Sequence, residues 1–193
     1  MNYSKPPLSF QQQIEAFKQR GLIFEDEHTS RVFLENISYY RLRAYTYPFQ
    51  DNTNSQHPFI KKISFEEIIT LYNFDSKLRT LVFEALEKIE IAFRTQIIYR
   101  WSMAYGSHWY TDPTLFRNPV FFANSLSSLE KEINRSDETF IKHYNKTYTH
   151  PKLPPSWMSL EVSSLGLLSK LFLNLKRNAQ KKAFTQHFGV YKV

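Results

Sequence analysis

Residues 74–100 read FDSKLRTLVFEALEKIEIAFRTQIIYR and contain neither glycine nor proline. Their apolar residues recur every three or four positions, a spacing that predicts one long helix in the core of the fold. Charged residues are embedded in this pattern, with Glu84, Glu87 and Glu90 alternating with lysines and arginines. A charge inside an apolar helix needs a partner or a purpose, so this helix is also the first candidate for function.

Signals on both sides of it predict more helices. Residues 9–12 (SFQQ) and 64–67 (SFEE) each match the capping box that starts a helix, and Gly21 and Gly106 suit helix ends. The chain has only 4 glycines, too few for the many tight turns of a β-sandwich. We therefore predict an all-α, irregular helical bundle of about six to eight helices with little strand, in which the long helix breaks near residues 73–75.

The rest of the chain is divided by a proline-rich segment. Pro119 suits the first position of a helix, and Ser136 is placed to cap a shorter one. Residues 150–155 (HPKLPP) are predicted to form an extended linker, followed by a single helix over residues 156–175. We predict one helical domain over residues 1–193, with this linker inside it.

The composition excludes several kinds of site. A chain without cysteine can form no disulfide, thiolate nucleophile or cysteine zinc site. Its 6 histidines are scattered and no metal motif is present, so we expect no metal and no cofactor. Residues 1–20 lack the apolar region of a secretion signal, and no apolar run reaches the ~18–20 residues of a membrane span. We expect a soluble, cytoplasmic protein with no membrane partner.

The net charge is +7, and the excess is concentrated near the C-terminal end. No acidic residue follows Glu161, whereas six basic residues do: Lys170, Lys176, Arg177, Lys181, Lys182 and Lys192. A basic patch indicates a polyanionic partner, and we expect four of these residues to bind RNA: Lys176, Arg177, Lys181 and Lys182. The alternative is a solvated helix face whose lysines only add solubility.

Three charged residues of the long helix form the next candidate site. Glu87, Glu90 and Arg94 are spaced by three and four positions, which places them on one helix face. Arg94 could hold an RNA phosphate while the two glutamates support it, and Arg100 is a further candidate for RNA binding. The alternative is an ordinary helix ion pair between Glu90 and Arg94, worth ~0.3–0.5 kcal/mol.

Tyrosine and arginine alternate over residues 39–47 (YYRLRAYTY). Aromatic rings stack on bases and arginine binds phosphate, so Tyr40 and Arg41 are candidates for RNA contact. In the alternative interpretation, the tyrosine rings cover the edge of the core and leave their hydroxyls in water.

A dense polar patch, RSDETFIKHY, spans residues 135–144. Arg135, His143 and Tyr144 could together perform general acid–base chemistry on a phosphodiester. The alternative is a helix start at which Asp137 and Glu138 complement the helix dipole.

Several segments, in this order, resemble the Abi-like (abortive infection) family of bacterial phage-resistance proteins. They are NISYYRLRAYTYPF (36–49), SFEEIITLYNFDSKLRTLVFEALEKIEIAFRTQIIY (64–99), YGSHWYTD (105–112), RSDETFIKHY (135–144), LPPSWMSLEVSSLGLLSKLFLNL (153–175) and HFG (187–189). Each segment alone has little specificity, but the ordered set covers nearly the whole chain and is strongly specific.

The resemblance implies a cytoplasmic, all-α protein related to HEPN ribonucleases, which acts on RNA in a toxin-like way and curbs host growth during phage infection. It also implies a homodimer and an antitoxin or small RNA as partner. The family's catalytic signature, Arg-x4–6-His, cleaves RNA without metal. Glu90 and Arg94 match a supporting Glu-x3-Arg pattern, whereas Arg100 stands where many relatives carry histidine.

The catalytic signature itself is not found in this sequence. Arginine precedes His28, His108 and His143 by eight positions, one more than the signature allows, and the signature is expected beyond the position of residues 187–189. Two hypotheses remain open. The chain could be a C-terminally truncated member that binds RNA or a partner without cutting, a non-catalytic module of a toxin–antitoxin or defence system. Alternatively, it could be a metal-independent endoribonuclease that uses His143 and Arg135, assisted by Arg94.

Overall fold

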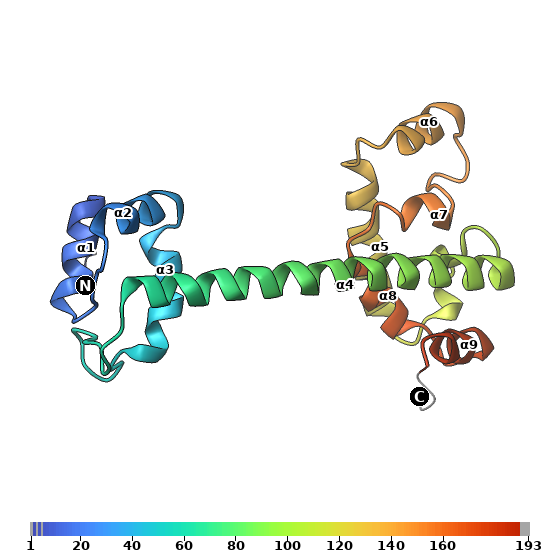
Figure 1. Cartoon of the computed structure of the whole chain (residues 1–193). Coiled ribbons are helices and arrows are strands. Elements are labelled where there is room, and N and C mark those ends of the chain that lie inside the picture. Colours follow the sequence, from blue (N-terminus) through green and yellow to red (C-terminus); the bar gives the residue numbers. More distant parts are fainter. Residues whose placement is uncertain (1, 3, 5, 190–193) are drawn as a thin grey trace. The chain divides into compact units, whose positions relative to one another are not determined.

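The computed structural model describes residues 2, 4 and 6–189, and this part of the chain is built from helices (Figure 1). No strand occurs among these residues, which form only isolated bridges such as Gln50 with Phe59. The all-α prediction is therefore confirmed. Lys192, which was counted in the basic C-terminal end, lies outside the described residues.

The elements follow one another as α1 (Phe10–Gln19), α2 (Glu27–Asn36), α3 (Tyr39–Thr46), α4 (Phe65–Tyr105), α5 (Pro119–Asn134), α6 (Thr139–Thr147), α7 (Ser156–Ser159), α8 (Leu165–Asn174) and α9 (Ala179–His187). Short 3-10 turns lie at Tyr47–Phe49, Trp109–Thr111 and Pro113–Leu115. No helix in the described part of the chain has both the length and the apolar character needed to cross a membrane.

Two compact units divide the chain, Met1–Glu84 and Ala85–Val193, and α4 contributes residues to both. The first unit contains α1, α2, α3 and the start of α4, packed around Ile14, Phe17, Leu34 and Leu42. The second unit has a separate core with more aromatic residues, which includes Trp101, Trp109, Tyr110, Leu129 and Leu168. The prediction of a single domain over residues 1–193 stays a prediction.

Both predicted capping boxes are present in the first unit. The Ser9 amide donates to Gln12 over 2.8 Å, and the Gln12 amide donates back to the Ser9 hydroxyl over 3.3 Å. Ser64 and Glu67 form the same reciprocal pair at 2.8 and 3.2 Å, immediately before α4. These bonds satisfy amides that have no partner inside the helix, and so they set where each helix begins.

The helix α4 runs without interruption from Phe65 to Tyr105, so the predicted break near residues 73–75 is wrong. Nothing in that segment forces a break, because it contains neither glycine nor proline. The predicted helix end at Gly106 is confirmed, since this residue follows the helix with a φ of 86°, a conformation that glycine adopts without strain.

The single helix predicted over residues 156–175 is also wrong, because α7 and α8 are separate helices there. Ser164 causes the interruption: its hydroxyl accepts from the Leu167 amide over 3.3 Å and starts α8. Its own amide donates to Glu132 on α5 over 2.9 Å. Ser136 likewise lies before its predicted helix rather than at the cap, since α6 starts at Thr139 with Glu138 as the capping residue.

The proline-rich segment at residues 150–155 is held by aromatic side chains of the second unit. The Tyr110 hydroxyl donates to the Pro154 carbonyl over 2.5 Å, and the Tyr144 hydroxyl donates to the Pro151 carbonyl over 2.8 Å. Burial raises the pKa of Tyr110 to about 12. The predicted extended conformation is wrong for residues 150–153, which form bends, and the segment is fastened to the core rather than free.

Candidate nucleic-acid interface

Charge is divided unequally between the two units. Residues 1–84 contain ten basic and ten acidic residues, and residues 85–193 contain fifteen basic and eight acidic residues, so the whole excess of +7 lies in the second unit. The first unit is neutral as a whole. An anionic partner is therefore attracted to the second unit rather than to the chain in general.

Arg94 is buried, with 8% of its surface exposed. One guanidinium nitrogen donates to the Leu160 carbonyl, to the Glu161 carbonyl over 3.2 Å and to the Ser163 hydroxyl over 3.3 Å. The other donates to Glu90 over 2.5 Å. Arg94 therefore ties α4 to the connection between α7 and α8. The arrangement satisfies carbonyls that α7 leaves without partners inside the helix.

The other charged candidates of α4 are only partly assembled with Arg94. Glu90 is its ion-pair partner, as the spacing indicated, whereas Glu87 is exposed to solvent. Arg100 is half-buried and donates from its Nε to Gln96 over 2.9 Å. The structure thus brings Glu90 and Arg94 together, while Glu87 and Arg100 lie apart from them on the same helix.

Lys181 is also buried, with 6% of its surface exposed. Its ammonium donates to the carbonyls of Phe172 and Leu175 over 2.9 and 3.1 Å, at the C-terminal end of α8. Arg117 donates to the Leu175 carbonyl over 3.0 Å, so two cations occupy the negative end of this helix dipole. Burial, followed by repulsion from Arg117 and Arg177, lowers the pKa of Lys181 to about 8.

Three of the predicted basic residues, Lys176, Arg177 and Lys182, are exposed to solvent. We call these three residues the basic segment. They lie between α8 and the start of α9, where Asn178 caps α9 by accepting from the Lys181 amide over 2.9 Å. The sequence did offer a sign that Lys181 differs from them, because it lies three positions before Phe184, a core residue of the same helix.

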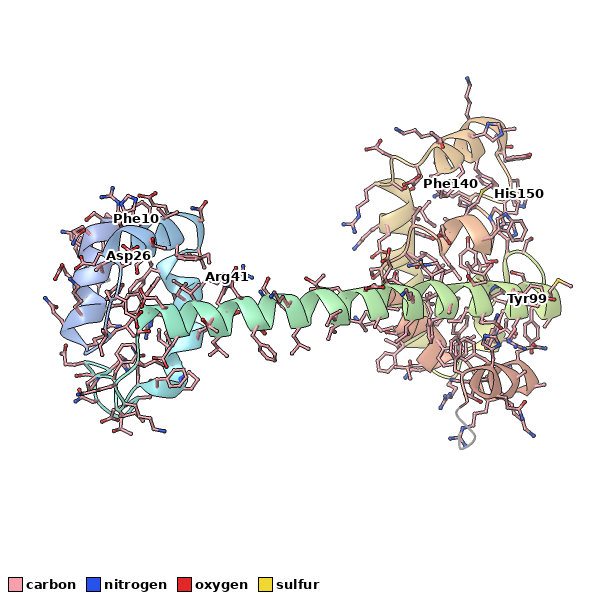
Figure 2. All side chains as sticks on the ribbon, viewed as in Figure 1. Phe10, Asp26, Arg41, Tyr99, Phe140 and His150 are labelled. Carbon is pink, nitrogen blue, oxygen red and sulfur yellow. The ribbon has the colours of Figure 1, made fainter. Side chains whose placement is uncertain are left out.

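The tyrosine-rich helix α3 belongs to the first unit. It agrees in part with the interpretation that it contacts RNA and in part with the alternative that its tyrosine rings cover the core. Tyr40 is 83% exposed and Arg41 is exposed beside it (Figure 2). By contrast, the Tyr39 ring packs against Phe17 with ring centres 4.6 Å apart, and Tyr45 donates to Asp75 over 2.6 Å. Tyr40 and Arg41 are thus accessible to a ligand, while their neighbours stabilise the core.

The proposed acid–base group is not assembled around one point. Tyr144 is buried and its hydroxyl is engaged by Pro151 and Leu153 carbonyls at 2.8 and 3.2 Å. His143 and Arg135 are exposed, and among the described residues no recorded hydrogen bond joins them. Arg135 instead lines a cleft of about 480 Å³ together with Glu132, Glu138 and Glu161. These carboxylates would repel a phosphodiester.

A larger groove between α5 and α8 was missed by the sequence analysis. It has a volume of about 610 Å³ and is lined by Arg117, Asn118, Phe121, Asn124, Ser125, Lys170, Leu173 and Asn174. The residues that α5 contributes are separated by three or four positions and therefore share one helix face. Polar residues on the apolar face of a helix were thus the sequence signal that could have indicated the groove. No group of histidine and acidic residues suited to a metal occurs in residues 2, 4 and 6–189.

Comparison with known proteins gives one match. The model of the family described as Abi-like protein matches residues 32–193, which includes most of the first unit and all of the second. No curated protein and no solved structure matches the chain significantly.

Proposed function

The chain belongs to the Abi-like protein family, and from this premise we propose that it is an abortive-infection protein that binds RNA through its second unit. The family assignment supports a role in abortive-infection phage defence. RNA binding, toxin-like growth arrest, a relation to HEPN domains and a cytoplasmic location are our proposals beyond it.

The observation that carries the proposal is the exposed basic segment. Its three cations are solvent-facing and belong to the unit that carries fifteen basic and eight acidic residues. The hydrogen bond with Thr114 lowers the pKa of the Asp112 carboxyl, and Lys176 lies close enough to contribute to the same shift. Phosphate binding by lysine and arginine releases counterions, so it provides affinity for any RNA and a steep dependence on salt. The neutral first unit offers no comparable excess of charge.

We propose binding rather than cleavage, because two of the candidate catalytic side chains have structural partners. Arg94 is engaged by Leu160, Glu161 and Glu90, and Tyr144 holds the proline-rich segment. A residue that holds two elements together cannot turn to a substrate without breaking those contacts. This favours the hypothesis of a non-catalytic, RNA-bound component of a defence system over an endoribonuclease.

The test is the affinity of the full chain for a single-stranded RNA at several salt concentrations. We expect the triple variant Lys176→Gln, Lys182→Gln, Arg177→Gln to weaken binding by at least about tenfold and to reduce the salt slope by about 2. The matched control is Lys61→Gln, Lys62→Gln, Lys77→Gln, which removes three exposed cations from the first unit. Equal losses in both variants, or binding that is insensitive to salt, would contradict the proposal.

We also propose a second copy of the chain as partner, with an antitoxin or a small RNA as the regulatory component. The part of α4 in the second unit exposes three aliphatic side chains, Leu86, Ile89 and Ile91, which a second copy could cover. Light scattering after gel filtration should give the mass of a dimer for the wild type and of a monomer for Ile89→Gln. A wild-type monomer at all concentrations would remove the homodimer.

A further inference from the structure

We propose that the groove between α5 and α8 seats one nucleotide of an RNA chain, an inference that deepens the RNA-binding function proposed above. The two helices pack against each other within the second unit (Figure 1). Their groove, at about 610 Å³, falls within the size range of ligand pockets. Of its residues, only Lys170 was noted from the sequence, as part of the basic C-terminal end.

Each helix contributes one face to the groove. On α5, Phe121, Asn124 and Ser125 follow a spacing of three and four positions and therefore lie on one side of the helix. On α8, Lys170 and Leu173 are three positions apart. A smaller cleft of about 290 Å³ shares Asn124, Ser125 and Lys170 with it, so the groove continues along both helices. Glu132 lines this smaller cleft, so the site for an anion is confined to the larger groove.

The polar side chains of the groove fall into two sets. Those of Arg117, Asn118 and Asn174 make structural hydrogen bonds at the ends of α5 and α8, whereas those of Asn124, Ser125 and Lys170 make none among the described residues. Ser125 is only 7% exposed, yet no recorded hydrogen bond within the described part of the chain uses its hydroxyl. The side chains of Asn124 and Lys170 also lack a recorded partner among those residues. Asn124 and Lys170 are exposed, so the groove offers a ligand an amide, an ammonium and the Ser125 hydroxyl that are not engaged within the described part of the chain.

The charge of the groove points to an anion. Its two charged lining residues, Arg117 and Lys170, are both cationic. Arg117 is close enough to Lys181 to lower the pKa of that lysine, and Arg177 of the basic segment acts on the same lysine. The Arg117 end of the groove is therefore electrostatically continuous with the basic segment, which gives an RNA backbone a positive path out of the groove.

The apolar part of the groove suits a base. Phe121 is 62% exposed, and Leu173 is exposed on the opposite helix. An exposed ring next to amide and hydroxyl groups can stack on a base while these groups bond to its edge, and Lys170 can then bind the phosphate. Arg117 is engaged by the Leu173 and Leu175 carbonyls, so it contributes positive charge rather than a free donor. An acidic peptide would use the cations but would leave the ring and the Asn124–Ser125 pair without matching groups.

The experiment compares four single variants of the full chain for binding to single-stranded oligouridylate. Phe121→Leu keeps the apolar volume and removes the ring, and Lys170→Gln removes one charge. Their matched controls, Val120→Leu and Lys131→Gln, alter residues of α5 that do not line the groove. We expect Phe121→Leu to lower the affinity on the order of tenfold and Lys170→Gln to lower the salt slope by about 1. The controls should remain within about twofold of the wild type.

Two further outcomes separate this inference from the proposed function. If the wild type binds RNA and the groove variants bind it equally well, the groove inference is overturned while RNA binding stands. If the wild type binds no RNA, the same variants are tested with uridine monophosphate. If the wild type binds uridine monophosphate and Phe121→Leu does not, the groove is supported as a nucleotide site. Binding of polyglutamate but not of uridine monophosphate would overturn it.

Discussion

The two arginines that follow an acidic residue by four positions on α4 have different environments in the two units. In the first unit Arg79 pairs with Asp75 and donates to the Tyr45 hydroxyl over 2.9 Å, with about a third of its side chain exposed. In the second unit Arg94 pairs with Glu90 in the same register, but only 10% of its side chain is exposed. The same spacing therefore gives a partly exposed ion pair at Arg79 and a buried arginine that joins two elements at Arg94.

The largest expected difference between Arg94 and Arg79 is in their contributions to the free energy of unfolding. Replacing Arg94 by methionine leaves Glu90 without its partner and removes the guanidinium from the carbonyls of Leu160 and Glu161. The Leu160 carbonyl keeps the amide and hydroxyl of Ser163 as donors. The side chain of Glu90 is 34% exposed, so the loss comes mainly from the hydrogen bonds of the buried guanidinium, at about 1.5–3 kcal/mol of unfolding free energy. Denaturant unfolding followed by tryptophan fluorescence measures it selectively, because all 3 tryptophans lie in the second unit.

Arg79→Met is the matched control for that measurement. Its ion pair is partly exposed, so the expected loss is about 1 kcal/mol or less. The tryptophan signal should also move less than in Arg94→Met, since the substitution lies in the first unit. Equal destabilisation by the two substitutions would show that burial does not distinguish these arginines.

Tyr110→Phe should have the next largest effect, about 0.5–1.5 kcal/mol at neutral pH, because the Pro154 carbonyl loses one of its two buried donors and keeps the Ser159 hydroxyl. The folded pKa of Tyr110 is raised to about 12, so between pH ~10 and 12 the folded state retains a proton that the unfolded state has lost. Wild-type stability should therefore fall across this range relative to the variant. Parallel pH profiles above pH 10 would contradict the burial of this hydroxyl.

Most of the fold follows from local sequence signals. Residues 9–12 and 64–67 form capping boxes because the reciprocal bonds involve only residues three positions apart. The interruption between α7 and α8 could not be predicted, because Ser164 is stabilised there by Glu132, thirty-two positions earlier. Local propensity does not include such a partner.

The candidate site was predictable to a smaller extent than the fold. Burial decides whether a cation can reach a ligand or instead holds part of the structure, and the sequence does not show burial directly. The charge count pointed to the end of the chain, where Lys176 is exposed, but it treated Lys181 like Lys176 although Lys181 lies among helix carbonyls. The groove between α5 and α8 was not found from the sequence, because Phe121 and Ser125 lie on a different helix from Lys170 and only the packing of the two helices brings them together.

Lys181→Met tests this buried cation. The folded pKa of Lys181 is lowered to about 8, so between pH ~8 and 10.4 the unfolded state holds a proton that the folded state has released. Wild-type stability should rise across this range relative to the variant, by on the order of 1 kcal/mol once partial solvent access is considered. The stability change with pH therefore has the opposite sign to the change expected for Tyr110. A difference that stays flat through the range would place Lys181 in solvent, like the basic segment.

The smallest effect is expected for His143→Ala. His143 is exposed on α6, so its removal should change the unfolding free energy by less than about 0.5 kcal/mol. RNA affinity should also remain within about twofold of the wild type, since the carboxylates Glu132, Glu138 and Glu161 line the nearby cleft that holds Arg135. The measurement is RNA binding and RNA integrity after incubation without metal, with Lys142→Ala on the same helix as control. If the wild type cleaves RNA and only His143→Ala abolishes the cleavage, the catalytic site lies on α6. A substitution without structural effect would then have removed a proton donor or acceptor.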